Sequence, residues 1–502
     1  MKKIKKSRII LIIFTVILAL VMSLFGVACD SEQRGKDNGS QNSTLTPDDK
    51  NDGNTNTDDS GNTTPDNSGN TDTDNSGNTT PDDTTPDNSG DNTGDNTGNN
   101  TGDNTGNNTG DNTGDNTGNN SGNNSGNNSG NNSGSIDSDV VTGDKGEIST
   151  SKVSIHFLEL GSGKTGDSIL IKCGNTEVLI DAGAVQSSAS TIKSYINQYC
   201  TDGKLEYVIA THTDTDHIAA FFGNSSGGKY NGILYTYEIG TIIRFDKIKK
   251  STSNYTKFCD AVTYAESQGA QVFTASQCYD QTVEGAQRQY YLDEEHTVSI
   301  NILYNYYYYN TSSDENNHSV VTLLTEEVDG GRRNYLFTGD LEEDGESRMV
   351  DYYKSVPAGY ATEYNVLPEV ELYKAGHHGS KTSSTLKLLD VIKPKYVTVC
   401  CCAGSPQYST ENAHTFPTQQ MIDNVAKYTD KIYVTTLCAS VNEKDESGNY
   451  KTQNHAEYTS MNGNIVFYST GENLKLYCSN NDTILKDTDW FKENRTWTEG
   501  GV

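Results

Sequence analysis

The densest group of metal-binding side chains in the sequence is the heptapeptide THTDTDH, Thr211–His217. Its imidazoles and carboxylates are the ligand types that hold a divalent ion and leave a position open for water. The apolar run Tyr207–Ala210 directly before it is predicted to be a buried strand, so these ligands lie in a loop at a strand end. Two later strand-end segments repeat the pattern, LFTGD at Leu336–Asp340 and LYKAGHHGS at Leu372–Ser380. Together they predict one metal centre built from distant parts of the chain.

Each of these residues also has an ordinary structural explanation. A single strand-end aspartate is usually a helix N-cap, and Asp340 precedes the helical pattern Leu341–Tyr353. A lone histidine is usually a hydrogen-bonded surface or core residue. The joint occurrence of all three segments, in this order, favours the metal centre.

Strand-like and helix-like segments alternate from Val153 onward. Strands are predicted at 153–160, 168–173, 177–180, 207–210, 241–245, 271–274, 297–304, 320–325, 334–338, 371–374, 396–399, 431–436, 464–468 and 474–477. Helices are predicted at 187–200, 254–268, 341–353, 384–392 and 418–428. Meander-like strands followed by strand–helix alternation predict a sandwich of sheets flanked by helices.

The motifs THTDTDH, FTGD and AGHHGS, in that order, resemble the metallo-β-lactamase superfamily. More narrowly, they resemble the extracellular hydrolase domain of the competence DNA-uptake protein ComEC, in which Asp replaces the second histidine of H-x-H-x-D-H, as Asp214 does here. Further matching segments are HFLELG at 156–161, LIDAG at 179–183, NHSVV at 317–321, HHGSKTSS at 377–384 and HTFP at 414–417. The resemblance spans residues 153–477 and implies a mixed α+β/α/β fold, a four-layer αββα sandwich.

The resemblance also implies two divalent metal ions. The residues that it makes metal ligands are His212, Asp214, Asp216, His217, Asp340 and His377. The first two would hold one ion and the next two the other, with Asp340 bridging the ions and His377 completing the second site. Asp181 would orient the histidine loop without touching an ion.

Further residues are candidates for chemistry beside the metals. His378 and His414 are predicted to contact substrate or to protonate the leaving group, and Asp216 is a plausible general base. His318 is a candidate metal or substrate contact, although the family's equivalent histidine aligns nearer Glu315.

One glycine-rich segment mimics a phosphate-binding loop. Residues Gly161–Asp167 read GSGKTGD, but the glycine required five residues before Gly163 is Leu158. An ATPase is therefore rejected.

The predicted activity is hydrolysis of a phosphodiester, in nucleic acid or a nucleotide, by a metal-bound hydroxide. Zinc is the default for mixed nitrogen and oxygen ligands, and a set of three carboxylates leaves manganese open. A hydrolase of amides, thioesters or lactones is one alternative, although Asp214 argues against a true β-lactamase. A catalytically inert surface-binding module is another, since the tyrosine run Tyr306–Tyr309 would suit exposed contacts or packing on a sheet edge.

The N-terminal pattern is typical of an export signal. Five basic residues precede the apolar run Ile9–Val27, and small residues then lead to Cys29, which resembles the lipidated cysteine of a bacterial lipobox. Residues 1–28 would be a lipoprotein signal segment, which anchors the chain by lipid to the extracytoplasmic face of the membrane. An uncleaved transmembrane anchor and cleavage without lipid are the alternatives.

A tether follows the signal. Residues 29–150 are rich in Asn, Gly, Asp and Thr and contain no aromatic residue, so they are predicted to be disordered and to carry the domain into or through the cell wall. The predicted hydrolase domain is 151–480, followed by a tail, 481–502.

The folded part is acidic in its own right. Of the total charge of −30, residues 1–29 contribute +5 and residues 30–150 contribute −19, which leaves −16 for the remainder. This argues against a generally basic nucleic-acid surface. No protein partner is indicated, and the nine cysteines beyond Cys29 form no C-x-x-C pair, so a zinc–thiolate knuckle is not expected.

Overall fold

The computed structural model describes residues 141–248, 251–356, 366–439, 443–453 and 457–500. The predicted signal segment, Cys29 and the tether up to residue 140 lie outside the described residues. Within the described ranges, no helix combines the length and the apolar character needed to cross a bilayer.

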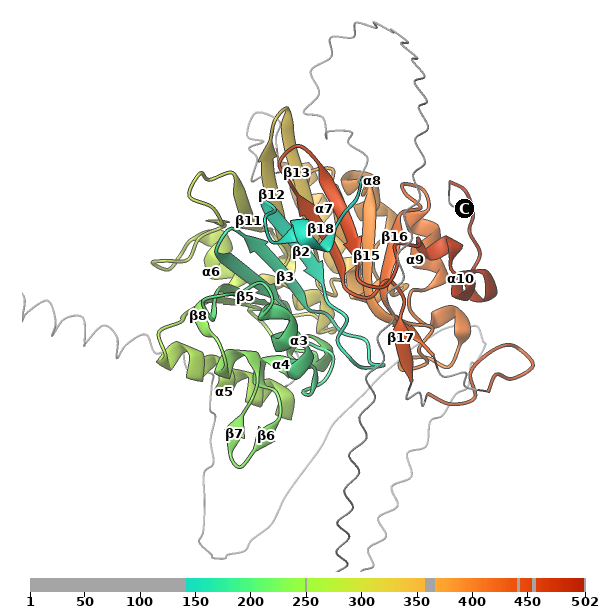
Figure 1. Cartoon of the computed structure of the whole chain (residues 1–502), viewed down its shortest axis with the longest axis horizontal. Helices are drawn as coiled ribbons and strands as arrows, with labels where there is room; N and C mark the ends of the chain where they lie inside the picture. The colour runs from blue at the N-terminus through green and yellow to red at the C-terminus, as the bar shows by residue number, and fades with distance from the viewer. Residues whose placement is uncertain (1–140, 249–250, 357–365, 440–442, 454–456, 501–502) are drawn as a thin grey trace, which may run out of the picture. The chain divides into compact units, whose positions relative to one another are not determined.

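The first of the two large sheets has nine strands, which come from both ends of the described chain (Figure 1). In spatial order its strands are β1 (Val141–Thr142), β19 (Leu474–Cys478), β18 (Ile465–Ser469), β2 (Val153–Phe157), β3 (Ile169–Cys173), β4 (Thr176–Ile180), β5 (Lys204–Ala210), β8 (Glu238–Arg244) and β9 (Gln271–Thr274). Strands β18 to β4 pair antiparallel, and β4, β5, β8 and β9 pair parallel. The central strands are nearly continuous apolar runs, because both faces of this sheet are covered.

The second sheet has eight strands. In spatial order they are β10 (Gln289–Tyr291), β11 (Val298–Ile302), β12 (Thr322–Val328), β13 (Gly331–Phe337), β14 (Leu372–Lys374), β15 (Tyr396–Ala403), β16 (Ile432–Cys438) and β17 (Tyr458–Ser460). Strands β10 to β13 form an antiparallel meander, and β13 to β16 run parallel.

The helices cover the outer faces of the two sheets. Those on the side of the first sheet are α3 (Ser188–Ile196), α4 (Thr215–Phe222) and α5 (Ser253–Ser267), and those on the second are α7 (Glu343–Ser355), α8 (Leu386–Ile392), α9 (Gln419–Val425) and α10 (Asp489–Asn494). Strand β13 shows the layering residue by residue. Tyr335 and Phe337 pack into the core that contains the first sheet and its helices, whereas Leu336 between them packs with α7 to α10. The predicted helix–sheet–sheet–helix sandwich is confirmed.

Both ends of the described chain pack onto this sandwich. Gly143 N donates to Leu476 O at 2.7 Å, beside β1, and Ile148 of α2 (Lys145–Ile148) is buried. Residues 481–500, set apart as a tail in the prediction, contribute Leu485 and Phe491 to the second core. This segment therefore forms part of the folded body.

Local structure differs from the prediction most at the histidine loop. Helix α4 begins at Thr215, with Asp214 at its N-cap, so Asp216 and His217 lie in the first turn of a helix and not in a loop. The small helix α6 (Ala275–Asp280) and the hairpin of β6 (Ser225–Ser226) and β7 (Lys229–Tyr230) were not predicted either.

Parallel pairing brings the ends of four strands to the same region. Asp181 follows β4 and Thr211 follows β5, which are parallel neighbours in the first sheet. Asp340 follows β13 and Gly376 follows β14, which are parallel neighbours in the second. The hydrogen bond from Val320 N to Thr211 O, at 2.9 Å, joins the two groups across the sandwich.

Candidate metal centre

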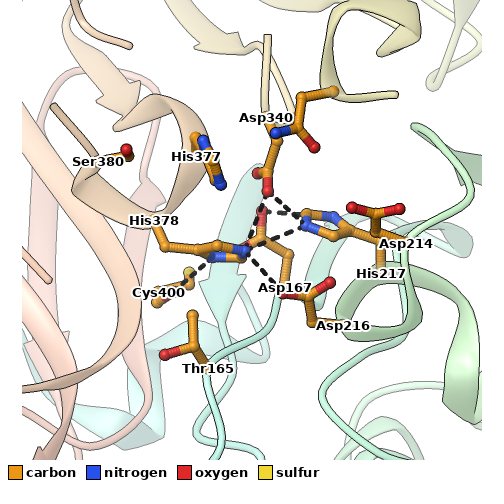
Figure 2. Close-up of polar contacts among 12 residues, drawn as sticks. Thr165, Asp167, Asp214, Asp216, His217, Asp340, His377, His378, Ser380 and Cys400 are labelled. Atoms are coloured by element: carbon orange, nitrogen blue, oxygen red, sulfur yellow. Dashed lines mark hydrogen bonds and ion pairs between the residues drawn. The ribbon is translucent and has the colours of Figure 1, made fainter. Parts of the chain in front are cut away.

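Four acceptor atoms converge at these strand ends. They are Nε2 of His217 and His378 and one carboxylate oxygen each of Asp216 and Asp340. His217 Nε2 lies 3.0 Å from Asp340 Oδ2 and 3.2 Å from His378 Nε2. His378 Nε2 lies 3.1 Å from Asp340 Oδ2 and 3.5 Å from Asp216 Oδ2. Figure 2 shows the four side chains directed at one another.

The opposite nitrogen of each imidazole is already engaged. His217 Nδ1 lies 2.8 Å from Asp181 Oδ2, and the other oxygen of Asp181 accepts the Thr211 backbone N–H. His378 Nδ1 lies 2.9 Å from the carbonyl oxygen of Cys400. Because a carboxylate and a carbonyl only accept, each ring donates from Nδ1 and directs the lone pair of Nε2 into the cluster. Four acceptors therefore face one another, which is costly in a buried site unless a cation lies among them.

The spacing of the four atoms fits a divalent ion. Zinc bonds to nitrogen and oxygen of about 2.0–2.1 Å place two tetrahedral ligands about 3.3–3.4 Å apart. The observed separations run from 3.0 to 3.5 Å. His217, Asp340 and His378 thus match the type and spacing of three ligands of a tetrahedral ion, and Asp216, 3.5 Å from His378, is the candidate for the fourth.

The electrostatics of the cluster also call for positive charge. Burial alone would lower the pKa of His217, but the carboxylates of Asp340 and Asp181 raise it well above its usual value. Burial alone would raise the pKa of Asp216, but hydrogen bonding with His378 and the charge of His217 lower it. Without a metal, protons on the imidazoles supply the charge that the carboxylates demand.

A second, looser group of ligands also includes Asp340. His212 is fully buried, and among the described residues its Nε2 has no hydrogen-bonding partner. This atom lies 4.0 Å from Asp214 Oδ2 and 4.0 Å from Asp340 Oδ2. Burial, and next the charge of Asp216, raise the pKa of Asp214 to about 6. The structure therefore brings together the three residues predicted for the first ion, with Asp340 common to both groups.

Asp167 and Lys374 contact residues of the cluster and were not predicted from the sequence. Metal-binding atoms of Asp167, His217, Asp340 and His378 all lie within 4.8 Å of one another. Asp167, however, faces the Nδ1 side of the rings, 3.1 Å from His378 and 3.9 Å from His217. We therefore assign it an orienting role, because those nitrogens carry protons. The fully buried Lys374 Nζ contacts Asp167 and lies 3.5 Å from Asp340 Oδ1, so it offsets the charge of both.

Of the two consecutive histidines, His378 lies in the cluster and His377, the predicted ligand, lies outside it. His377 Nδ1 lies 3.0 Å from Glu342 Oε1 and 3.1 Å from Thr382 Oγ1, outside the four acceptors, whereas His378 is one of the four. Both residues have positive φ, 45° and 54°, a region that side chains other than glycine rarely adopt. Such strain persists only where the surroundings fix it, and it marks functional sites.

His318 and His414, also predicted from the sequence, lie outside the cluster. His318 is buried, and its Nε2 accepts the Ser312 backbone N–H at 3.0 Å. His414 is at the surface, with Nδ1 3.0 Å from Glu411 Oε2 and Nε2 3.2 Å from Lys381 Nζ. His414 and Lys381 therefore form a polar pair that is accessible to solvent.

Tyr408 is a further residue that the sequence did not single out. Its hydroxyl donates to Asp216 Oδ2 at 2.6 Å, and its ring packs against Phe416 with centroids 5.4 Å apart. The ring of Phe416 in turn lies 6.1 Å from that of His378. Tyr408 and Phe416 thus form an aromatic wall beside the cluster.

A buried carboxylate holds the loop that carries the two histidines. Glu346 of α7 accepts the backbone N–H groups of Ser384 and Thr385, at 2.7 and 2.9 Å, and the Thr385 hydroxyl at 2.7 Å. Burial raises the pKa of Glu346 from its usual 4.5 to about 7. The loop after His378 is therefore fixed to α7 by a group that titrates near neutrality.

This raised pKa predicts a pH-dependent stability. Between pH 4.5 and 7 the folded chain holds the Glu346 proton more tightly than the unfolded chain, so the free energy of unfolding falls as pH rises through this window. The shift corresponds to about 3 kcal/mol at most. Urea denaturation of the full chain from pH 4.5 to 7.5 should show that Glu346→Gln loses this decline relative to the unaltered protein. Equal slopes for the two proteins would contradict the assignment.

No family model matches the chain, and no curated protein matches it in sequence. The solved structures similar to it include proteins of the metallo-β-lactamase fold. The metallo-β-lactamase fold protein YhfI from Bacillus subtilis is 9% identical, with 56% of this chain and 95% of that chain covered and a TM-score of 0.31. A putative metallo-β-lactamase from Thermotoga maritima is 13% identical, with 42% and 88% covered and a TM-score of 0.23. CmlA, a diiron β-hydroxylase from Streptomyces venezuelae, is 9% identical, with 50% and 45% covered and a TM-score of 0.29.

Proposed function

We propose that this protein is a metal-dependent hydrolase of phosphodiesters. The observation that carries the proposal is the convergence of acceptor atoms of His217, Asp340 and His378 within 3.0 to 3.2 Å, with Asp216 3.5 Å from His378 and with Asp340 shared by a second group of ligands. Buried acceptors in this arrangement would hold a cation, and a bound cation would supply the Lewis acidity that hydrolysis needs.

The two groups divide the ligands between two ions. Asp216, His217, Asp340 and His378 would hold one ion, and His212, Asp214 and Asp340 the other. Zinc suits this mixture of imidazole and carboxylate, and the three carboxylates leave manganese as the alternative. When bound, such ions lower the pKa of a water molecule and polarise the scissile group.

The residues around the ligands have separate tasks. Asp181 and the Cys400 carbonyl fix the two imidazoles through Nδ1, and Lys374 offsets the charge of the carboxylates. The Tyr408 hydroxyl holds one oxygen of Asp216 and restricts the rotation of its carboxylate. His414 Nε2 accepts from the Lys381 ammonium at the surface, so this pair would contact an anionic substrate, with the lysine as the proton-bearing partner.

Phosphodiesters are favoured over other substrates by the resemblance of the motifs. Asp214 stands where amide-hydrolysing members of the superfamily carry histidine, as in the DNA-processing subgroup. The charge of −16 on residues 151–502 opposes long polyanions, so we favour short or single-stranded substrates. Hydrolysis of amides, thioesters or lactones is the alternative for the same cluster.

We also propose that the chain is exported and anchored by lipid at Cys29. The support is the sequence alone: a basic segment, an apolar run and small residues before the cysteine. Metabolic labelling with a palmitate analogue should mark the unaltered chain and not Cys29→Ser. Equal labelling of both would contradict the anchor.

Turnover of model substrates by the full chain tests the proposed activity. We expect metal-dependent hydrolysis of bis(p-nitrophenyl) phosphate and of a polymeric substrate, single-stranded DNA. Hydrolysis of nitrocefin should be small. Asp216→Ala should lose this activity, whereas Asp329→Ala, an exposed aspartate in the turn between β12 and β13, should keep it. Full phosphodiesterase activity in Asp216→Ala would refute the role of the cluster.

A further inference from the structure

A second group of ligand-type side chains lies at the opposite end of the first sheet. Glu177 is near the start of β4, and Cys200 and Asp202 lie in the segment that leads from α3 into β5. Metal-binding atoms of these three residues all lie within 4.8 Å of one another. Gly203, with a φ of 78°, makes the turn that places Asp202 beside the thiol.

The spacing of the thiol and the aspartate matches a bound zinc ion. Cys200 Sγ lies 3.6 Å from Asp202 Oδ1. Tetrahedral bonds of about 2.3 Å to sulfur and about 2.0 Å to oxygen place those two ligands about 3.5 Å apart. The same Asp202 oxygen accepts the Lys204 backbone N–H at 3.0 Å, which holds the carboxylate in position.

Glu177 supplies an independent sign that a cation belongs here. Its side chain is 2% exposed, and within the described part of the chain its Oε2 has no hydrogen-bonding partner. Its other oxygen, Oε1, contacts Lys172 Nζ. A buried carboxylate oxygen without a donor is costly, and a metal ligated by Oε2 would remove that cost.

Without a bound ion, the Cys200 thiol keeps its proton. Burial raises the pKa of the Cys200 thiol, and the charge of Glu177 adds to the rise. The thiol proton meanwhile has an acceptor in Lys204 O, at 3.1 Å. Binding of a divalent ion would transfer that proton to solvent and leave a thiolate ligand.

The geometry points to a second metal site, in which Glu177, Cys200 and Asp202 bind one zinc ion through a thiolate and two carboxylates. The fourth position is left to water, because Asp202 is exposed. The ion would tie the turn after α3 to β4.

This site is separate from the cluster proposed to be catalytic. That cluster lies beyond the far ends of β4 and β5, after Ile180 and Ala210. At about 3.3 Å per residue, the length of β5 sets the two sites on the order of 20 Å apart. Occupancy of one site is therefore testable without the other.

Cobalt provides the probe, because only a thiolate ligand gives a near-ultraviolet sulfur-to-cobalt charge-transfer band. Metal-free full chain titrated with Co²⁺ should develop this band, with a final intensity equal to one thiolate-bound ion per chain. Cys200→Ser should lose the band and bind one ion fewer, while hydrolysis of bis(p-nitrophenyl) phosphate is unchanged. The matched control Cys478→Ser, half-buried on β19, should keep the band.

If Cys200→Ser fails to fold, Asp202→Asn tests the same zinc site. Asparagine can still accept the Lys204 N–H, so the turn is kept while the charged ligand is lost. Its zinc affinity at this site should fall at least about 10-fold. The proposal is overturned if no band forms in the unaltered chain, if the band persists in Cys200→Ser, or if Asp202→Asn binds zinc as tightly as the unaltered chain.

Discussion

Replacing His378 by glutamine is expected to lower phosphodiester hydrolysis by more than about 100-fold and to remove one tightly bound metal ion. The loss of a residue that merely orients a ligand costs about 10- to 100-fold, so the loss of the ligand should cost more. His378 Nε2 makes three of the four close approaches in the cluster, to His217, Asp340 and Asp216. Glutamine cannot place a nitrogen lone pair at that point.

His377→Gln is the matched control for this substitution. His377 adjoins His378 and shares its left-handed backbone, but its ring contacts Glu342 and Thr382. This variant should retain the full complement of metal, measured by inductively coupled plasma mass spectrometry on the full chain. Loss of an ion from His377→Gln, with retention in His378→Gln, would restore the ligand assignment made from the sequence.

Asp340→Asn is expected to have the largest effect of any single substitution. Asp340 Oδ2 lies 3.0 Å from His217 Nε2, 3.1 Å from His378 Nε2 and 4.0 Å from His212 Nε2, so it is the residue common to both groups of ligands. The amide removes the charge that both ions require, and both should be lost or bound far more weakly. Activity should fall below that of His378→Gln.

Asp167→Asn provides the comparison for Asp340→Asn. Asp167 is as deeply buried and contacts Lys374, but it faces the protonated side of the imidazoles. Its substitution should reduce metal affinity by about 10- to 100-fold without abolishing binding. If metal titrations show that Asp167→Asn and Asp340→Asn lose both ions equally, Asp167 is itself a ligand.

The sequence was sufficient to predict the architecture and most of the cluster. Strand ends are recognisable as apolar runs that stop at polar residues, and the parallel order of β4 with β5 and of β13 with β14 brings those ends together. His217, Asp216 and Asp340 are therefore found in one place. The pairing of Asp181 with His217 Nδ1 likewise agrees with the orienting role expected from the resemblance.

The sequence could not show which of His377 and His378 points into the cluster. Adjacent residues on a regular strand or helix point in different directions by a known angle, but these two occupy the left-handed region in succession. Their side-chain directions depend on tertiary contacts, such as the hold of Glu346 on the following loop. Spacing alone contains no information about such a turn.

Residues that reach the cluster from irregular segments were missed for a related reason. Asp167 lies in a glycine-rich turn that sequence patterns associate with phosphate binding, and Tyr408 lies in a long connection after β15. Gly183 indicates how the segments fit together, because a Cβ there would lie 1.5 Å from the Asp216 carbonyl oxygen. Only the packed structure shows such close approaches of distant backbone segments.

Anomalous X-ray diffraction at the zinc edge, from crystals of the full chain prepared with zinc, tests the central claim most directly. We predict an anomalous peak enclosed by Nε2 of His217 and His378 and by the carboxylates of Asp216 and Asp340. A metal-replete crystal with no peak at that position, or with the peak ligated by His377 in place of His378, would contradict the metal centre described here.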